Sequence, residues 1–353
     1  MSWHQASIRF SAIAIMFTAL ALSAVPAAMA ESPVIAQQQL KYRIAKQKWE
    51  EKHIPTGLSN ARAFAKREKQ PNARASGTDR TAMLLENVDF SIADDIGFSV
   101  KKLILTLEPK KRGAPVDFDK VDSFTIRLQS GEIVLRSSAL TALFNKHVLD
   151  YPGHSLANMK MKIADGRLSA TGTMVLCNCL GDLGIPSSFS GTISLTRDNK
   201  LAFKIDKIES FGFEVGDLLK SLGMSPATLI NTKRPGVAMK GFTIELDHRK
   251  VFPFPEMEGN ISHISMKSDG LHITFADAPN AKLNPPASLG KSFIWIQSGD
   301  PKFYGAIITN AKIALVSANK RKKLHFDLYG YRKLLSSAVA QLNTDGMLVV
   351  RIP

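Results

Sequence analysis

The residues from Phe124 to Leu176 constrain the fold more than any other stretch, because the spacing of their apolar residues changes twice. Apolar residues alternate on both sides of Ser130-Gly131, recur every three or four positions after Ser137, and alternate again around Asp165-Gly166. This order predicts a hairpin, a helix and a second hairpin. The helix stripe would be Leu140, Leu143, Phe144, His147 and Val148. The hairpins would place these pairs opposite each other: Leu128 and Ile133, Ile126 and Leu135, Ile163 and Leu168, and Met161 and Ala170.

Similar elements are predicted before and after this stretch. The alternation over 98–107 breaks near Lys101-Lys102, which predicts a β-bulge. The phase of the hairpin over 190–208 requires the loop Arg197-Asp198-Asn199, so that Leu195 faces Leu201. Further predictions are a strand over Gly236–Leu246, a hairpin around Asp269-Gly270 that pairs Ile264 with Phe275 and Met266 with Ile273, and a final strand over Met347–Ile352. Two more helices would carry the stripes Val215, Leu218, Leu219 and Leu222, and Leu334, Leu335, Ala338 and Leu342. Short turns between successive strands require mostly antiparallel pairing, so the predicted fold class is α+β.

Residues 1–30 are expected to be a signal peptide. Arg9 precedes an apolar run from Phe10 to Leu22, and Ala28-Met29-Ala30 is a small-x-small cleavage site. The run is too short to span a bilayer, and no later run approaches the roughly 18 apolar residues of a transmembrane helix. We therefore predict export to a bacterial periplasm.

The charge of the chain indicates anionic partners. The sequence has 46 Lys and Arg against 31 Asp and Glu, a net charge of +15, and removal of Arg9 leaves 15 − 1 = +14. Such a protein would attract an anionic membrane surface or an acidic polysaccharide, and export leaves no expected nucleic-acid partner. Residues 31–80 are predicted to be a basic arm and linker, either solvated or helical on an anionic membrane. Residues 81–353 would form the folded domain.

The sequence contains no local signature of catalysis or metal binding. It has no Gly-x-Ser-x-Gly elbow, no His-Glu-x-x-His and no calcium-loop spacing of acids. Leu289-Gly290-Lys291-Ser292 resembles the end of a phosphate loop, but Pro285 stands where that loop requires a glycine. Cys177 and Cys179 are expected to be a structural or incidental pair, since two thiols cannot complete a zinc site. We expect no catalytic residue, cofactor or metal; a hydrolase would need a nucleophile and a base brought together from distant segments.

The order of the predicted elements resembles that of the tubular lipid-binding superfamily, which includes the bactericidal permeability-increasing protein and small exported bacterial relatives. The resemblance covers residues 81–353 in pattern and implies a long curved antiparallel sheet wrapped around amphipathic helices, forming an elongated apolar tube. It rests on Leu135–Leu140 leading to Phe144, Leu156–Leu168 with Gly172, Ile185-Pro186 before Phe189–Ile193, Ile208–Leu222, and Phe242–Phe275 with Gly259.

These observations lead to a hypothesis of a non-enzymatic periplasmic protein that binds or shuttles phospholipid or a related anionic amphiphile. The alternative is a structural or adaptor protein of the envelope that binds an acidic polymer or a partner protein. The predicted lipid-binding residues are Leu140, Phe144, Val148, Met161, Phe203, Phe211, Phe213 and Leu218. The residues predicted to meet headgroups or the membrane surface are Lys110, Lys111, Arg112, Lys320, Arg321, Lys322 and Lys323.

Overall fold

The computed structural model describes residues 80–151, 154–175, 184–221, 234–277, 279 and 283–353. All of them belong to one compact unit, Lys52–Pro353. The predicted signal peptide, the predicted basic arm up to residue 79, and the pair Cys177 and Cys179 lie outside the described residues.

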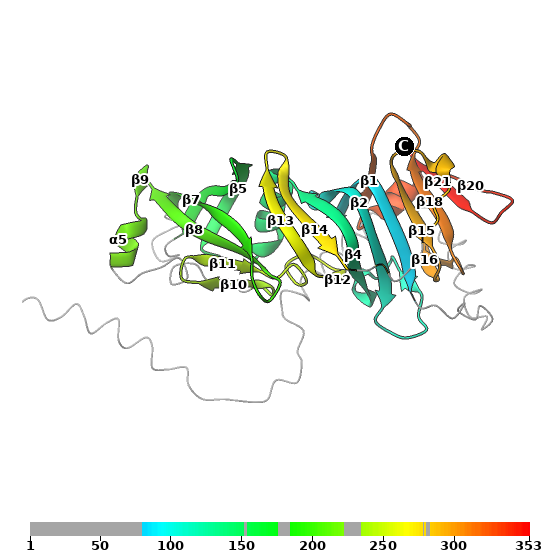
Figure 1. Cartoon of the computed structure of the whole chain (residues 1–353), viewed down its shortest axis with the longest axis horizontal. Helices are drawn as coiled ribbons and strands as arrows, with labels where there is room; N and C mark the ends of the chain where they lie inside the picture. Colours follow the sequence, from blue (N-terminus) through cyan, green and yellow to red (C-terminus); the bar gives the residue numbers. More distant parts are fainter. Residues whose placement is uncertain (1–79, 152–153, 176–183, 222–233, 278, 280–282) are drawn as a thin grey trace, which may run out of the picture. The chain divides into compact units, whose positions relative to one another are not determined.

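The described chain is mainly β-structure, so the predicted α+β class is wrong (Figure 1). Strands account for 56% and helices for 11%, and only one helix of the described chain reaches seven residues. There are several sheets instead of one sheet wrapped around amphipathic helices. The described helices are α4 (Ser137–Leu143), continued by a π-helical turn (Phe144–Val148), α5 (Gly216–Ser221), α7 (Tyr331–Ser336) and two short 3₁₀ turns, Val121–Ser123 and Ala287–Leu289. None of them combines the length and apolarity that crossing a bilayer would require.

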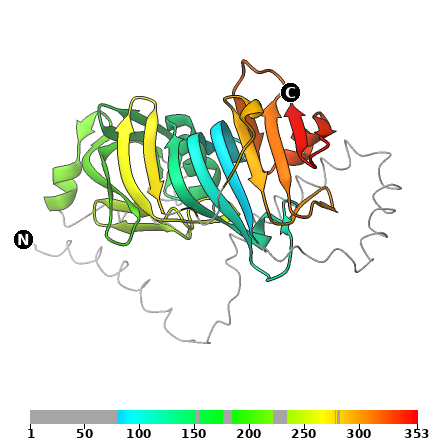
Figure 2. The same cartoon turned by 45° about the vertical axis from the view of Figure 1, so that its right-hand side comes forward.

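The largest sheet contains eleven strands, and its main path runs β13-β14-β4-β2-β1-β15-β18-β21-β20. Figure 1 shows this path from the yellow β13 and β14 through the cyan β1 to the red β20, and Figure 2 shows the yellow and cyan strands side by side. The strands are β1 (Thr81–Ala93), β2 (Ile96–Pro109), β4 (Phe124–Leu135), β12 (Glu256–Glu258), β13 (Ile261–Lys267), β14 (Gly270–Ala276), β15 (Phe293–Gln297), β18 (Lys312–Ser317), β19 (Leu324–Asp327), β20 (Val339–Leu342) and β21 (Leu348–Ile352).

Two smaller sheets complete the described part. The second has seven strands in the path β10-β11-β8-β7-β6-β5, with β9 beside β8. Its strands are β5 (Leu156–Ala164), β6 (Arg167–Val175), β7 (Gly184–Leu195), β8 (Leu201–Ser210), β9 (Phe213–Glu214), β10 (Val237–Lys240) and β11 (Thr243–Leu246). The third sheet joins β3 (Val116–Asp117), β16 (Pro301–Phe303) and β17 (Ala306–Ile307).

Several predicted registers are confirmed. In the β5–β6 hairpin, Ile163 pairs with Leu168 and Met161 with Ala170, as predicted from the turn at Asp165-Gly166. In the β7–β8 hairpin, Leu195 pairs with Leu201. The amide of Thr196 donates to the carbonyl of Lys200, which closes the predicted three-residue loop. The register between β2 and β4 shifts between Val100 and Lys102, where a bulge was predicted.

The hairpin predicted at Ser130-Gly131 does not exist, because both residues lie inside the continuous strand β4. Gly131 pairs with Leu103 of β2 on one side and with Phe275 of β14 on the other. A Cβ atom there would lie 2.0 Å from the carbonyl oxygen of Lys102, and the residue has a φ of 134°. This glycine therefore permits a neighbouring strand to approach closely, and it does not form a turn.

The β13–β14 hairpin has a different register from the predicted one, because its turn is Ser268-Asp269 and Gly270 already belongs to the strand. Ile264 pairs with Ile273 instead of Phe275, and Met266 pairs with Leu271 instead of Ile273. Gly270 is the first residue of β14. A Cβ atom at this position would lie 2.5 Å from the carbonyl oxygen of Leu135, so a larger residue does not fit. A shift of two residues leaves the predicted faces unchanged.

Two other predicted elements are corrected. The strand predicted over 236–246 is a hairpin of β10 and β11, in which Val237 pairs with Leu246. The last predicted helix ends at Ser336, and Leu342 belongs to strand β20, where Leu342 pairs with Leu348. Three- and four-residue spacing of apolar residues thus arises here from a short helix followed directly by a strand.

Two apolar clusters lie on opposite faces of the eleven-stranded sheet. Along β15, Ile294 and Ile296 belong to the main cluster, whereas Phe293 and Trp295 belong to the smaller one. Alternation along a strand requires these two sets to face opposite ways. The main cluster continues into the seven-stranded sheet and contains Phe144, Phe203 and other residues of the candidate site.

Candidate functional site

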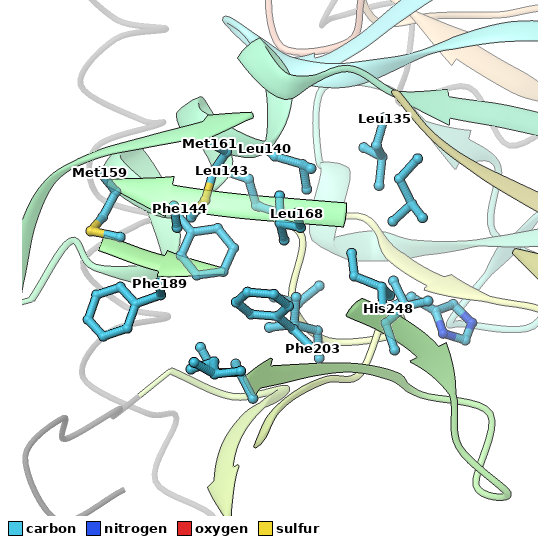
Figure 3. Close-up of a pocket in the computed structure, with 18 of the residues that line it drawn as sticks. Leu135, Leu140, Leu143, Phe144, Met159, Met161, Leu168, Phe189, Phe203 and His248 are labelled. Atoms are coloured by element: carbon cyan, nitrogen blue, oxygen red, sulfur yellow. The ribbon is translucent and has the colours of Figure 1, made fainter. Parts of the chain in front are cut away.

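An apolar cavity of about 50 Å³ lies within the main cluster (Figure 3). Of the twenty described residues that line it, nineteen carry apolar side chains and His248 is the exception. The helical segment after Ser137 and the seven-stranded sheet supply most of the lining, and Leu135 of β4 and Leu271 of β14 come from the eleven-stranded sheet. The cavity is therefore enclosed by parts of both large sheets, with the segment Val251-Phe252 beside them.

The helical wall of this cavity is held in place by polar side chains on a different face of the same helix. Strand β5 is an edge strand, and its outward amides need partners. The amide of Ile163 donates to Ser137 Oγ over 3.0 Å, and the amide of Met161 donates to Thr141 Oγ1 over 2.9 Å. Asn145 binds Met159 twice, since its Oδ1 accepts from the amide (2.9 Å) and its Nδ2 donates to the carbonyl (2.6 Å). The four-residue spacing of these polar residues matches the alternate amides of the strand.

The apolar stripe of the helix faces the cavity. Leu140, Leu143 and Phe144 line it, and Phe203 and Phe189 of the seven-stranded sheet lie across from them in Figure 3. Met159 and Met161 contribute two thioether side chains from β5. Unbranched thioethers adapt readily to guests of different shape, so this wall can change its form more easily than one of β-branched residues.

His248 is the one polar residue among the described residues of the lining, and it is buried. Its Nε2 lies 2.9 Å from the carbonyl oxygen of Gly259 and donates to it. Burial lowers the pKa of His248, which keeps the ring neutral at pH 7. Figure 3 shows the ring nitrogens turned away from Leu168 and Phe203, so the cavity meets the carbon part of this side chain.

A buried cationic group lies behind the helix, at the π-helical turn. The Nη2 group of Arg234 donates to the carbonyl of His147. Both residues are buried, at 4% and 3% exposure. Burial, together with the charge of Arg234, lowers the pKa of His147 to about 3. Burial also lowers the pKa of Arg234, while the charge of Asp150 acts in the opposite direction. This side of the site therefore contains a neutral histidine and a guanidinium ion whose charge is partly compensated by Asp150.

The structure brings together four of the eight predicted lipid-binding residues. Leu140, Phe144, Met161 and Phe203 line the cavity. Val148 is buried in the same cluster but is not part of the lining. The side chain of Leu218 lies outside the described part.

Phe211 and Phe213 do not line the cavity and are corrected here. Their side chains are 67% and 74% exposed. Both residues lie at the tight turn between β8 and β9, where Phe211 has a φ of 52° and does not face the core. The sequence could not distinguish these aromatic residues from inward ones, because a two-residue reversal at Gly212 ends the alternation.

The sequence interpretation also missed part of the lining. Leu135 and Leu271 come from strands of the other sheet, which no local pattern connects to the helix. Phe189 and Ile205 could have been found, because they alternate with the predicted inward residues of the β7–β8 hairpin.

The predicted headgroup residues do not form one rim around the cavity. Lys110 pairs with Glu256 at 3.1 Å and lies over the ring of Phe254, and Lys111 and Arg112 are exposed. Lys323 pairs with Asp89 at 2.8 Å. Arg321 is exposed, while Lys320 and Lys322 line a separate groove that includes Met347 and Val349 of the smaller cluster. The geometry therefore does not favour a single amphiphile that places its tail in the cavity and its headgroup on Lys320.

Comparison with known protein families, with characterised proteins and with solved structures finds no match for this chain. The resemblance to tubular lipid-binding proteins remains a prediction. Within the described residues, no group of three or more His, Cys, Asp or Glu side chains is arranged to hold a metal ion. The interpretation of the site consequently depends on its own geometry.

Proposed function

We propose that this protein binds the acyl part of a phospholipid or a related amphiphile in the apolar cavity and transfers it between membrane surfaces. The observation that carries the proposal is the lining, in which nineteen of the twenty described side chains are apolar and both large sheets contribute. Each methylene group moved from water into such a site contributes roughly 0.8 kcal/mol, so the ligand would be held by its chain and not by specific polar contacts.

The volume of the cavity sets a condition on this function. Sites for small molecules usually measure about 300–1,000 Å³, whereas this cavity measures about 50 Å³. Entry of an acyl chain therefore requires the walls to separate. Met159 and Met161 can change rotamer at low cost, and Phe144 and Phe203 would have to turn aside. Chain transfer needs no chemical step in this account, in keeping with the prediction of a non-enzymatic protein.

The proposal places the protein in the bacterial periplasm, on the basis of the leader-like residues 1–30. A periplasmic carrier would shield acyl chains from water between two membranes. The positive charge of the chain would favour its approach to anionic lipid surfaces.

A second candidate is an envelope adaptor protein with a filled core. The small cavity volume favours this alternative, because a cavity of about 50 Å³ is also compatible with ordinary packing between two sheets. The two functions differ in one property: only the carrier needs the cavity to open.

The cavity can be tested by filling it. Ala170 is buried in the lining, and an Ala170→Leu substitution would add three carbon atoms to the space that an acyl chain must enter. Ala238→Leu is the matched control, because Ala238 lies exposed on β10 of the same sheet. The measurement is the fluorescence change of a phospholipid with a pyrene-labelled acyl chain.

We expect the unsubstituted protein and Ala238→Leu to bind the labelled lipid, and Ala170→Leu to bind at least about tenfold more weakly, which is about 1.4 kcal/mol. Circular dichroism would verify that all three are folded. Absence of binding by the unsubstituted protein, or equal binding by all three, would contradict the carrier and favour the adaptor.

A further inference from the structure

A second hollow, which we call the basic groove, lies beside the end of the eleven-stranded sheet. Its volume is about 430 Å³, within the usual range for small-molecule sites. Three segments line it: residues 288–292, residues 316–322 without Asn319 and Arg321, and residues of the β20–β21 hairpin. It shares no lining residue with the apolar cavity.

Among the described residues that line the basic groove, four carry cationic side chains and none carries a carboxylate. These are Lys291, Lys320, Lys322 and Arg351. No ion pair within 4.0 Å joins any of them to an acidic residue in the described part of the chain. Lys323, the neighbour of Lys322, pairs with Asp89 and is not part of the lining. Four positive charges gathered without internal compensation create a site that attracts anions.

The groove is formed by ordered backbone. Asn319 shapes the turn that presents Lys320 and Lys322, because its carbonyl accepts from the amide of Lys322 (2.9 Å) and its Oδ1 accepts from the amide of Arg321 (3.0 Å). The amide of Ala318 donates to the carbonyl of Ile352, which ties this turn to β21. On β21 itself, Arg351 Nη1 donates to Gln341 Oε1 over 3.1 Å.

The groove also has an apolar part. Leu289, Val316, Met347 and Val349 line it and belong to the smaller apolar cluster or pack against it. The lining further includes the hydroxyl groups of Ser288 and Ser317 and the amide of Asn343. Cations, neutral hydrogen-bonding groups and an apolar surface therefore lie within one hollow.

We propose that the basic groove binds an organic phosphate ester. Lysine and arginine groups bind phosphate oxygens through charge-assisted hydrogen bonds. An inorganic anion would leave the apolar part of the groove in contact with water, whereas an ester would cover it with its carbon atoms. The phosphate would lie among Lys291, Lys320, Lys322 and Arg351, and the organic group would lie against Met347 and Val349.

This inference goes beyond the function proposed for the cavity and stands independently of it. The two hollows have separate linings, and each can be altered without touching the other. The ester can come from a soluble metabolite or from the headgroup of an anionic phospholipid. Both sources present the same chemistry to the four cations, so the experiment must separate them.

The test uses the full mature protein and two kinds of probe. Titration calorimetry with glycerol 3-phosphate, and with inorganic phosphate for comparison, measures binding of a soluble ester. Co-sedimentation with vesicles of phosphatidylglycerol in phosphatidylcholine measures binding of a headgroup, with pure phosphatidylcholine vesicles as the neutral reference.

The groove variant combines Lys291→Gln, Lys320→Gln and Lys322→Gln. The control variant combines Lys267→Gln, Lys312→Gln and Lys333→Gln, which removes the same charge from positions outside the groove lining. In the described part of the chain none of these six lysines forms an ion pair with a carboxylate, so the substitutions are expected to leave the protein folded. Urea unfolding of both variants would verify this.

We expect the groove variant to lose about tenfold or more in affinity for the ester or the anionic vesicle, and the control variant to change by less than about threefold. Binding of glycerol 3-phosphate would assign a soluble ester, and binding of anionic vesicles alone would assign a headgroup. Either result supports the proposal if only the groove variant loses affinity. Equal losses in the two variants would show that only net charge matters and would overturn it, as would absence of binding to every probe.

Discussion

The apolar cavity and the basic groove differ in size, chemistry and relation to the core. The cavity measures about 50 Å³ and is lined almost wholly by apolar side chains, while the groove measures about 430 Å³ and is lined by four cations. Alternation along β15 places the apolar cluster of the cavity on one face of the sheet and the cluster next to the groove on the other. The structure therefore has two separate hollows where the sequence predicted one apolar tube with a basic rim.

This difference has an energetic consequence. Residues of the cavity are part of the main core, so their substitution should change stability together with ligand binding. The cations of the groove are exposed and form no ion pair within the described chain, so their substitution should change anion binding alone.

A Phe144→Asp substitution should destabilise the protein by about 4 kcal/mol or more, because it removes a buried ring and places a carboxylate in an apolar cavity. Phe213→Asp is the matched control, since Phe213 is 74% exposed and should change stability by less than about 0.5 kcal/mol. Urea unfolding measures both. Similar losses in the two variants would show that the assignment of inner and outer phenylalanines is wrong.

An Asn145→Ala substitution should cost about 3 kcal/mol, because it leaves the amide and the carbonyl of the buried residue Met159 without their side-chain partner. Asn343→Ala, in the basic groove, should cost much less, since the side chain of Asn343 makes no hydrogen bond within the described part of the chain. Urea unfolding and hydrogen exchange at Met159 provide the measurement. An unchanged exchange rate at Met159 would contradict the role of Asn145 in holding the helix against β5.

Stability should decrease as the pH falls from 6.5 toward 3. The folded state keeps His147 neutral, with a pKa of about 3, whereas the unfolded chain takes up a proton near the ordinary value of 6.5. The unfolded state therefore binds more protons in this window, and the free energy of unfolding should fall by about 1.4 kcal/mol per pH unit, or about 2 kcal/mol at pH 5. His248, whose pKa is also lowered by burial, adds to the slope in the same direction.

The slope can be assigned with single variants measured by urea unfolding between pH 4 and pH 7. His147→Gln should reduce the slope without abolishing it, because His248 remains. His263→Gln is the matched control at an exposed histidine. A slope that survives in full in His147→Gln would mean that this histidine does not stay neutral in the folded protein.

The groove variant with glutamine at 291, 320 and 322 should differ from the unsubstituted protein by less than about 0.5 kcal/mol in stability, because exposed charges contribute little. If anything, removing like charges from one hollow should stabilise the protein slightly at low salt, and added salt should remove that gain. Thermal unfolding at low and high salt measures the difference. A loss of several kcal/mol would show that the groove is a structural part of the core.

The sequence predicts short-range pairing well where a turn determines the register. The β5–β6 and β7–β8 hairpins have the predicted pairs, because Asp165-Gly166 and the loop Arg197-Asp198-Asn199 lie between strands that are adjacent in the chain. The helix after Ser137 and its apolar stripe were also predicted. Four of the predicted lining residues, including Phe144 and Phe203, follow from these local patterns.

Features that depend on distant partners could not be predicted in this way. Gly131 resembles a turn residue until β2 and β14 are known to lie on either side of it. The pairing of β1 with β15 and with β19 joins segments about 200 residues apart, and no local period contains that information. For the same reason the sequence placed Lys320 and Lys322 at the rim of a tube, although they line a groove with Met347 and Val349.

The central claim is that the cavity holds an acyl chain, and the most direct test is native mass spectrometry of the purified mature protein followed by lipid extraction. The account predicts a stoichiometric adduct that extracts as an acyl lipid, is absent from Ala170→Leu, and persists in the groove variant. A protein that is detected without any adduct, and that remains so after incubation with phospholipid vesicles, would contradict the carrier function and leave the envelope adaptor as the better description.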